Sequence, residues 1–329
     1  MDLSVTKLPV SAPRLFNDDD VRTHLDPATA VRAVRAALLA HHEGTLAAPP
    51  RVRADIGDGH LVFTAGHLRE QGVFGFRAYD TIVDAEQLVA VWGAVDGELR
   101  ALVHGRELGA RRTGALGAVA VEAAAGPGPV RLALVGAGVQ AWTQLWALHG
   151  IREIEDAVVV ARRPDRAAAF ARRAAEELGL PVRVGSTVEE AVRDRNVVIV
   201  ATNSAVPVLE AGWIGPGTHV TTLGPKSASR HEIPAALAER ADVILTDSLA
   251  QVAGYPEAHL VDPERMTELG ALLAGAATGR TGPEQITLYC STGLAGTEVA
   301  LAAALWAAAP QKAAAPQKAA APQKAAAPQ

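Results

Sequence analysis

Two patterns of apolar positions divide the chain. From residue 49 to residue 104, short stretches of β-like composition are separated by glycine, and Asp96-Gly97 is typical of a hairpin turn. Consecutive strands joined by short turns predict an antiparallel or mixed sheet. The expected strands are RVRADI (51–56), HLVFTA (60–65), VFGFRAYD (73–80), LVAVWGAV (88–95) and LRALVH (99–104).

Helical patterns flank these strands. After an extended lead-in over residues 1–17, Asp26 supplies an N-cap, Pro27 occupies the first helical turn and Gly44 supplies a C-cap. Apolar residues recur between these ends at helical spacing, which predicts a helix. A second helix is expected over about 105–125, directly before the sequence GPGP.

After GPGP at 126–129, apolar strands alternate with helical stretches. This order predicts an α/β fold with a parallel, doubly wound sheet, beside an α+β region formed by the earlier strands. A last amphipathic stretch, about 293–309, is expected to leave this sheet and return to the first. The expected parallel strands are 130–135, 156–161, 183–186, 196–202, 218–223, 242–247 and 285–290.

The stretch from Val130 to Gly150 carries the strongest candidate site. An unbroken apolar run meets Gly136-Ala-Gly138-Val-Gln-Ala141, and a helical pattern follows. The first glycine allows a tight turn, the second lets the backbone approach a pyrophosphate, and the alanine lets the helix pack close to its strand. The N–H groups of the helix N-terminus then face the phosphates. The pattern predicts dinucleotide binding, and the alternative is an ordinary strand-to-helix turn.

Composition narrows the classes of function. With 329 residues, 49% of them hydrophobic and 20% charged, the chain suggests about two globular domains. A net charge of -5 without a basic stripe argues against a nucleic-acid partner. No signal peptide and no apolar run of membrane-spanning length is found in the sequence, so we expect a cytoplasmic enzyme for small molecules.

Two further features carry little chemistry. The single cysteine, Cys290, excludes an internal disulfide framework and a Cys-cluster metal site, and we expect a small buried residue there instead of a nucleophile. Residues 307–329 repeat AAAPQK, and proline at every sixth position blocks a continuous helix. We therefore expect a flexible tail over 310–329.

The end of the second parallel strand bears on the choice of nicotinamide cofactor. The strand runs into Arg162 and Arg163, without the acidic residue at its tip that usually binds the adenosine ribose of NAD. Guanidinium groups bind a 2′-phosphate through charge-assisted hydrogen bonds, which a carboxylate would repel. We therefore expect NADP(H) to be preferred, with NAD(H) as the alternative. A solvated face at the start of a helix would also explain the basic pair.

Several blocks spread over residues 10–306 share one resemblance. They are Pro49-Pro50-Arg51, GFRAYDT (75–81), Arg112-Thr113-Gly114-Ala115, the glycine turn with Gln140-Ala141, Pro207-Val208-Leu209, 216–220, Glu232-Ile233 and 291–298. In this order they resemble the ornithine cyclodeaminase and mu-crystallin family. The resemblance implies a Rossmann domain over 126–293 and a substrate-binding and dimerisation domain over 1–125 and 294–309. It also implies a homodimer.

The resemblance implies a site as well. The family holds the substrate carboxylate with basic residues at positions that match Arg51, Arg77 and Arg112, and guanidinium groups suit this task because they bind carboxylates bidentately. Taken alone, each arginine is better explained by a surface ion pair, and only the motif context favours a functional role. The expected cofactor-binding residues are Thr113, Gly136, Gly138, Val139, Gln140, Arg162, Arg163, Thr202 and Ser291.

Two departures from the cyclodeaminases change the expected reaction. Lys226 lies nearest the position where those enzymes have a catalytic aspartate, and HLVFTAG lacks their glutamate. A cyclodeaminase needs carboxylates near the amino groups of its substrate, so cyclodeaminase activity is not favoured. We expect Lys226 to be the proton donor of a reductase, with a structural or phosphate-contacting lysine as the alternative. His60 and His67 are the other candidate donors.

Together these expectations define an NADPH-dependent reductase of a carboxylate-bearing imine or ketimine, or an enzyme that runs the reverse amino-acid oxidation. Three alternatives remain. The first is a cyclodeaminase with bound NAD that acts on ornithine or lysine. The second is an amino-acid dehydrogenase that uses ammonia and a 2-oxo acid. The third is a crystallin-like protein that binds NADPH and a ligand without turnover.

Overall fold

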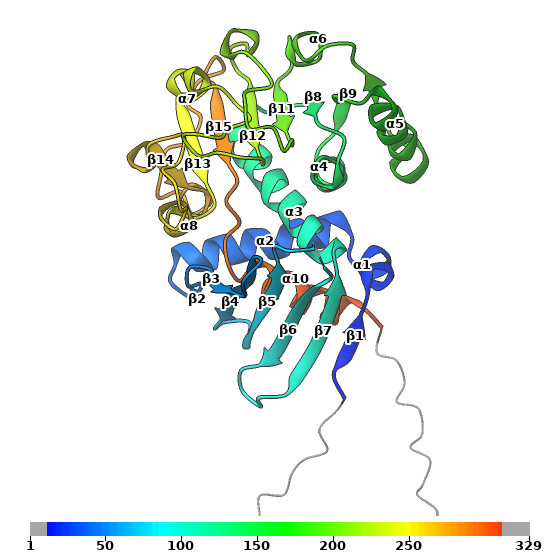
Figure 1. The fold of residues 1–329 in the computed structure, drawn as a ribbon, viewed down its shortest axis with the longest axis vertical. Helices are drawn as coiled ribbons and strands as arrows, with labels where there is room; N and C mark the ends of the chain where they lie inside the picture. Colours follow the sequence, from blue (N-terminus) through cyan, green and yellow to red (C-terminus); the bar gives the residue numbers. More distant parts are fainter. Residues whose placement is uncertain (1–11, 84, 311–329) are drawn as a thin grey trace, which may run out of the picture.

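The computed structural model describes residues 12–83 and 85–310, which form two sheets with helices packed on them (Figure 1). The tail expected over 310–329 lies outside the described residues from 311 onward. We call the sheet of β1 to β7 the first sheet and the sheet of β8 to β15 the second sheet. The expected fold class is confirmed by this architecture and by its similarity to solved structures described below.

The first sheet is mixed, as its sequence predicts. Neighbouring strands from β4 to β7 are antiparallel, while β1 joins β7 in parallel. Gly97, with φ at +69°, turns the chain between β6 and β7. The strands are β1 (Arg14–Phe16), β2 (Leu46–Ala47), β3 (Val52–Asp55), β4 (His60–Leu68), β5 (Val73–Asp80), β6 (Gln87–Gly93) and β7 (Leu99–Gly105).

Helix α10 (Thr297–Ala308) returns to the first sheet after the last strand of the second sheet, as expected. It packs on β4 to β7 and against α2 (Pro27–His42). The chain approaches β4 so closely that a Cβ on Gly66 would lie 2.4 Å from the Cα of Gly296. Sequence segments more than 200 residues apart are thereby held side by side, and the start of α10 is fixed over the sheet.

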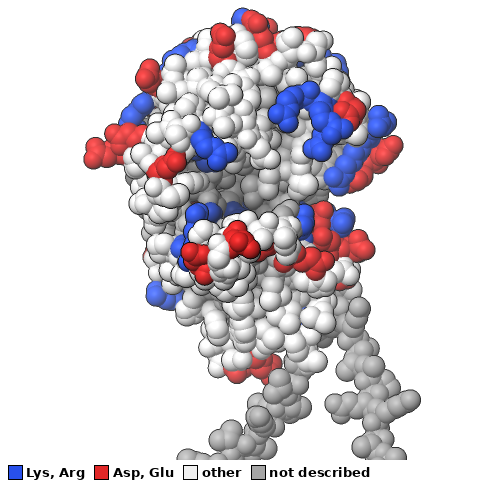
Figure 2. Space-filling model, in the orientation of Figure 1, with Lys and Arg blue, Asp and Glu red and all other residues white. Residues whose placement is uncertain are grey.

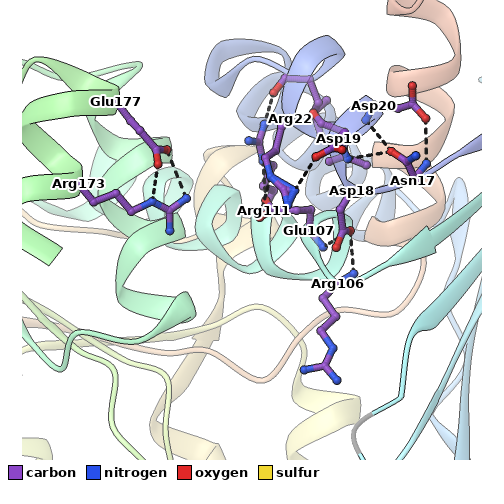
Figure 3. Close-up of polar contacts among 12 residues, drawn as sticks. Asn17, Asp18, Asp19, Asp20, Arg22, Arg106, Glu107, Arg111, Arg173 and Glu177 are labelled. Carbon is purple, nitrogen blue, oxygen red and sulfur yellow. Dashed lines mark hydrogen bonds and ion pairs between the residues drawn. The ribbon is translucent and has the colours of Figure 1, made fainter. Parts of the chain in front are cut away.

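Helix α1 (Asp18–His24) was not anticipated from the sequence, although Asn17 and Asp20 form a capping box at its start. The helix anchors α3 (Glu107–Ala124), because the Asp18 carboxylate accepts hydrogen bonds from the backbone N–H groups of Arg106 and Glu107 at 2.8 and 2.9 Å (Figure 3). This carboxylate satisfies two free donors at the N-terminus of α3. The position of α3 therefore depends on α1.

The second sheet is parallel throughout, in the order β10-β9-β8-β11-β12-β15-β13-β14. Its two edge strands, β10 and β14, are only two and three residues long, and β14 was not expected from the sequence. The strands are β8 (Val130–Val135), β9 (Ile154–Val160), β10 (Arg183–Val184), β11 (Val197–Val200), β12 (His219–Thr222), β13 (Val243–Thr246), β14 (Met266–Glu268) and β15 (Thr287–Cys290).

Short helices connect these strands. Helix α4 (Val139–His149) follows the glycine turn and runs beside α3, and a Cβ on Gly114 would lie 2.2 Å from the backbone oxygen of Thr143. The others are α5 (Pro164–Leu178), α6 (Val188–Val192), α7 (Ala235–Arg240), α8 (Leu249–Ala253) and α9 (Leu269–Leu273), with 3₁₀ turns at Ala211–Trp213 and Pro263–Arg265.

One apolar core joins the two sheets. It contains Val91 of β6, Leu116 of α3, Trp146 of α4, Tyr289 of β15 and Leu301 of α10, all buried. Because α3 contributes to this core along its length, it holds the end of the first sheet against the second. Within the described part of the chain, we find no helix that is long and apolar enough to cross a membrane.

Candidate functional site

The glycine turn has the geometry that its sequence predicts. Gly136 adopts a φ of +115°, and a Cβ there would lie 2.3 Å from the backbone oxygen of Ala201. A Cβ on Gly138 would meet nothing within 4 Å. Gly136 is thus required by the protein itself, whereas the open space at Gly138 admits the close approach of a ligand to the backbone. Gly138 is also the N-cap of α4 and leaves the first N–H groups of that helix without a side-chain cap.

A cavity of about 710 Å³, which we call the glycine-turn cavity, opens at this turn. It lies at the carboxyl ends of β8, β9 and β11, where parallel sheets of this type bind nucleotides. Five of the expected cofactor-binding residues line it: Gly136, Gly138, Arg162, Arg163 and Thr202. Its volume and open backbone fit part of a dinucleotide.

The other four expected cofactor residues do not line this cavity. Val139 and Gln140 are exposed in the first turn of α4. Thr113 lies on α3, where its backbone oxygen accepts a hydrogen bond from Gln144 of α4 at 2.8 Å. Ser291 is buried just after β15.

The basic residues after β9 are not equivalent. Arg163, the N-cap of α5, forms an exposed ion pair with Asp165, which lies two residues later in the first turn, at 2.6 Å. This pairing raises the pKa of Arg163 and lowers that of Asp165. Arg166, which the sequence reasoning did not single out, also lines the cavity. Arg162 and Arg166 therefore offer the positive charge that Asp165 does not already neutralise.

Glu232 holds the ends of β11 and β12 together. One carboxylate oxygen accepts from the backbone N–H and the hydroxyl of Thr202, both at 2.7 Å. The other accepts from the Thr222 hydroxyl and from the backbone N–H groups of Leu223 and Gly224 at 2.6 to 2.9 Å. Glu232 is completely buried, so these five donors replace its hydration. Sequence matching pointed to this residue but gave it no role.

Two of the three expected substrate arginines meet at one glycine. Gly293 follows β15 with a φ of +85°, and a Cβ there would lie 2.6 Å from Nη2 of Arg51 and 2.8 Å from Nη1 of Arg112. Arg51 also donates to the backbone oxygens of Thr292 and Gly293 at 2.5 and 3.1 Å. The Nε atoms of both arginines are buried without an acceptor. These orphaned donors are suited to a carboxylate.

Arg77, the third expected substrate arginine, contacts the same carboxylate as Arg112. Its Nη1 donates to Glu298 at 2.9 Å, and its Nε and Nη2 donate to Gln87 at 3.1 and 2.7 Å. The same oxygen of Glu298 accepts from Arg112 at 2.5 Å. Burial acts to raise the pKa of Glu298, but Arg112 and Arg77 outweigh it and hold that pKa below its ordinary value. Glu298 therefore orients two guanidinium groups while three arginines leave positive charge at the site.

Lys226 lies after β12 with a side chain that is only 5% exposed. Its Nζ donates to the backbone oxygens of Leu223 and Gly224 at 3.1 and 2.6 Å. Burial lowers the pKa of this lysine, although the nearby acidic groups of Glu232, Cys290 and Asp247 act against that shift. Lys226 lines neither the glycine-turn cavity nor the second cavity described next.

A second cavity, of about 250 Å³, adjoins Arg51 and separates β3 from the segment around α8. We call it the Tyr255 cavity. It is lined by Pro50, Arg51, Arg53, Gln251, Gly254, Tyr255, Pro256 and Thr292. Except for Arg51, these residues were not among the expected site residues. Pro50 and Thr292 lie in matched blocks without an assigned role, and the two walls of the cavity lie about 200 positions apart in the sequence. Figure 2 shows a hollow between the two lobes of the molecule, with Lys and Arg atoms at its edge.

The remaining candidates lie elsewhere. His67 is on β4 and contacts the ring of Phe74 on the outer face of the first sheet. His60 begins the same strand and is paired through its backbone with Thr81. Cys290 is buried, and burial raises the pKa of its thiol to about 12. A thiol with so high a pKa is a poor nucleophile, in agreement with its expected role as a small buried residue.

Another cavity, of about 790 Å³, lies at the amino ends of β8, β11 and β12 and is lined by Arg131, Asn196, Gly217 and Thr218 among others. Ligands of such sheets bind at the carboxyl ends of the strands. The arginines here are also committed to the protein, since Arg131 and Arg280 donate to backbone oxygens. We therefore do not place the functional site there.

No aspartate or glutamate lines the glycine-turn cavity or the Tyr255 cavity within the described residues. The buried carboxylates nearby have other tasks: Glu232 and Glu298 are engaged as above, and Asp247 accepts from Thr292 and Leu294. The two acids that the sequence lacks are therefore not replaced by a lining carboxylate from another segment.

A sequence model of the Ornithine cyclodeaminase/mu-crystallin family matches residues 14–312. The chain belongs to this family. Among its relatives within the family, Delta(1)-pyrroline-2-carboxylate reductase of Bacillus cereus is 31% identical over 218 residues, which are 64% of this chain and 67% of that protein. Two other relatives, 35% and 33% identical, are matched over only 62% and 60% of their length.

Solved structures of the family share the fold over most of their length. The Thermococcus litoralis Delta(1)-pyrroline-2-carboxylate reductase, solved with NADH and L-proline, superposes with a TM-score of 0.80 at 25% identity, over 89% of this chain and 96% of that one. An archaeal alanine dehydrogenase dimer with bound NAD gives a TM-score of 0.80 at 25% identity, over 90% and 95%.

Proposed function

We propose that the protein is a nicotinamide-dependent oxidoreductase that reduces a carboxylate-bearing imine or ketimine to an amino acid, or runs the reverse oxidation. The observation that carries this proposal is the convergence of Arg51 and Arg112 on Gly293. Arg112 belongs to α3, which packs along the helix of the glycine turn. The reductase and dehydrogenase names of relatives support the class of reaction.

The chain's own residues supply binding, orientation and a proton. Arg51 and Arg112 orient the α-carboxylate, with Glu298 and Arg77 fixing the second guanidinium. When bound, a reduced nicotinamide would supply a hydride for the imine carbon. The π electrons of the C=N bond then pass to nitrogen, which must carry a proton for the amine to form. We assign this proton to the ammonium of Lys226, which its two backbone carbonyl contacts hold in place.

The absence of acidic lining residues favours a reductase over a cyclodeaminase. A cyclodeaminase must bind and deprotonate an amino group, which calls for a carboxylate beside it. Reduction of an imine needs positive charge for the substrate carboxylate and a proton donor. Arg51 and Arg112 are the proposed source of the charge, and the buried Lys226 is the proposed donor. The carboxylate that a cyclodeaminase needs is therefore not found among the described residues that line the two cavities.

The direct test offers NADPH or NADH to the protein together with cyclic imine carboxylates of five- and six-membered rings, and follows nicotinamide absorbance. The proposal predicts oxidation of the cofactor with at least one of these imines. Ornithine and lysine serve as the comparison, with ammonia as the measured product. Ammonia release without cofactor oxidation by any imine would reject the reductase in favour of a cyclodeaminase.

For the cofactor we propose a preference for NADP(H). Arg162 and Arg166 line the glycine-turn cavity, and two charge-assisted bonds to a 2′-phosphate would favour NADPH by about tenfold or more each. Relatives have been solved with NADH and with NAD, so the proposed preference rests on Arg162 and Arg166 of this chain alone. Replacing Arg162 with Ala should lower the ratio of kcat/KM for NADPH to that for NADH. An unchanged ratio would reject the assignment.

We further propose that residues 1–125 and 294–309 form a substrate-binding and dimerisation domain, with 126–293 as the dinucleotide-binding domain. The outer face of the first sheet carries the half-exposed rings of Phe63, Phe74, Phe76 and Trp92, with Phe74 and Trp92 stacked at 5.7 Å. A second copy of the chain is the proposed occupant, since a relative is a dimer. Light scattering should find a dimer that Phe74→Glu weakens, and a monomeric wild type would contradict this.

A further inference from the structure

The Tyr255 cavity is a basic compartment between the two sheets. Arg51 and Arg53 line it from β3 and the residue before it, while Gln251 and Tyr255 line it from α8 and the loop that follows. The charges of both arginines act on Tyr255, which lies among them. No acidic residue lines the cavity among those the structure describes. A ligand group that enters it therefore meets positive charge and hydrogen-bond donors.

Two donors in the wall of this cavity have no acceptor. Gln251 is only 7% exposed, and its side-chain Nε2 is buried without a hydrogen-bond partner. The Nε of Arg51 is in the same condition. Most buried donors in folded proteins are paired, so the orphaned Nε2 of Gln251 indicates a missing acceptor, while the Nε of Arg51 is shared with the α-carboxylate position beside Gly293. The side chain of Arg53 is exposed and makes no hydrogen bond or ion pair with another described residue, so its charge remains available.

The nearest buried carboxylate does not fill this need. Asp247 acts on Tyr255 electrostatically, but its two oxygens accept hydrogen bonds from the backbone and hydroxyl of Thr292 and from the backbone of Leu294. Both carboxylate oxygens of Asp247 are thus engaged with the segment that carries Gly293, and they do not serve as acceptors for Gln251 or Arg51. Lys226 is the remaining cation near Arg51, and it adds to the positive charge.

Arg51 links the Tyr255 cavity to the substrate arginines. Its Nη2 lies against Gly293 and Thr292, beside Arg112, while the residue also forms part of the cavity wall. A ligand with one carboxylate beside Gly293 can thus extend a second anionic group past Arg51 toward Arg53 and Gln251. A substrate with an apolar side chain would leave these donors unpaired and would bury a basic wall without compensation.

We propose that the Tyr255 cavity is a second anion subsite, which takes the side-chain carboxylate of a dicarboxylic imino acid whose α-carboxylate binds beside Gly293. This inference rests on the proposed function for the identity of the α-imino group. The subsite itself is defined by Arg53, Gln251 and the shared Arg51. It selects imines of amino acids with an acidic side chain over cyclic or aliphatic ones.

The first test measures binding without turnover. Calorimetric titration compares succinate with butyrate, which has the same carbon count and one carboxylate. In the wild type we expect succinate to bind about tenfold tighter or more, as one charge-assisted contact provides. Arg53→Ala should remove this gap while changing the dissociation constant of butyrate less than about twofold. Gln251→Leu should reduce the gap with little change in side-chain volume.

Arg32→Ala is the matched control, because Arg32 is exposed on α2 and bonds only to Thr29 on its own helix among the described residues. The gap between succinate and butyrate should survive in this variant. Equal affinities in the wild type, or a gap that persists in Arg53→Ala, would overturn the subsite. Absence of measurable binding of both acids would overturn it as well.

A second measurement separates this inference from the proposed function. Oxidation of NADPH or NADH is followed with ammonium plus oxaloacetate, 2-oxoglutarate or pyruvate, and with cyclic imine carboxylates. The subsite predicts higher kcat/KM for the dicarboxylic acids by about tenfold. Efficient reduction of monocarboxylic imines alone would overturn the subsite and keep the reductase. If succinate binds more tightly than butyrate but no imine causes oxidation of the cofactor, the subsite is kept and the proposed reductase is overturned.

Discussion

Glu298 illustrates what single residues contribute to this site and how far the sequence reveals them. Arg51 and Arg112 could be predicted because family motifs surround them, and guanidinium groups bind carboxylates in a recognisable way. The oxygen of Glu298 that both Arg77 and Arg112 contact is visible only after α10 has returned to the first sheet. Gln251 and Arg53 were missed for the same reason, since their proximity arises from tertiary packing.

At the same scale, Lys226 makes a prediction for the pH dependence of kcat/KM. Burial lowers its pKa below the ordinary 10.5, so the ammonium loses its proton at a lower pH than a free lysine would. If this ammonium donates the proton, kcat/KM falls as pH rises through that lowered pKa. Lys226→Met should lower kcat by about 10²-fold or more while leaving the dissociation constant of NADPH unchanged.

Lys226→Arg provides the control for the charge of Lys226. Arginine stays protonated over the accessible pH range, so the basic limb of the profile should move upward even where kcat drops. The measurement is the full pH profile of imine reduction for the three proteins. Superimposable profiles would show that another group supplies the proton.

At the scale of elements, the site is assembled by the ends of strands and by α3. The sequence predicts β8, the glycine turn and α4 well because strand, turn and helix each follow a strong local pattern. It does not predict α1, although the capping box of Asn17 and Asp20 is a local signal that was available. The short edge strand β14 carries too few residues to show a period.

The two glycines of the turn give matched predictions. Gly138→Ala adds a methyl group into open space, so stability should hardly change while a ligand loses its close approach to the backbone. We expect weaker binding of NADPH with an unchanged Tm. Gly136→Ala places a Cβ 2.3 Å from a backbone oxygen at a positive φ, and should lower the free energy of unfolding by about 1 to 3 kcal/mol.

Fluorescence titration with NADPH and thermal unfolding distinguish the two variants. We expect opposite outcomes: a binding defect with normal stability for Gly138→Ala, and a stability defect for Gly136→Ala. Normal NADPH affinity of Gly138→Ala would mean that the cofactor does not approach this backbone.

At the scale of the whole molecule, the apolar core shared by the two sheets makes folding of one sheet depend on the other. Buried polar residues are part of this interior, and His219 of β12 is completely buried between the hydroxyls of Thr287 and Thr221 at 2.8 and 3.1 Å. Burial, with a smaller effect of Arg280, lowers the pKa of His219 to about 3. Overall topology was predictable because alternating strands and helices restrict the arrangement, whereas such buried polar contacts were not.

His219 therefore contributes to acid sensitivity. Its folded pKa of about 3 lies below the unfolded value of 6.5, so the unfolded chain binds the extra proton and stability falls as pH drops below 6.5. The loss amounts to about 1.4 kcal/mol per pH unit within that window. His219→Gln should flatten this fall in urea unfolding between neutral pH and mildly acidic pH. His42→Gln, at an exposed position on α2, should not, and equal slopes for wild type and His219→Gln would contradict the argument.

The claim on which the account depends is that arginines beside Gly293 recognise a carboxylate next to the reacting imine. The most direct measurement compares kcat/KM for one imine acid that the enzyme reduces with the same imine lacking its α-carboxylate, in wild type and in Arg112→Ala. We predict a preference of about 10²-fold or more for the acid in the wild type, which Arg112→Ala largely removes. A preference that is unchanged in Arg112→Ala would show that the carboxylate is bound elsewhere and would contradict the account.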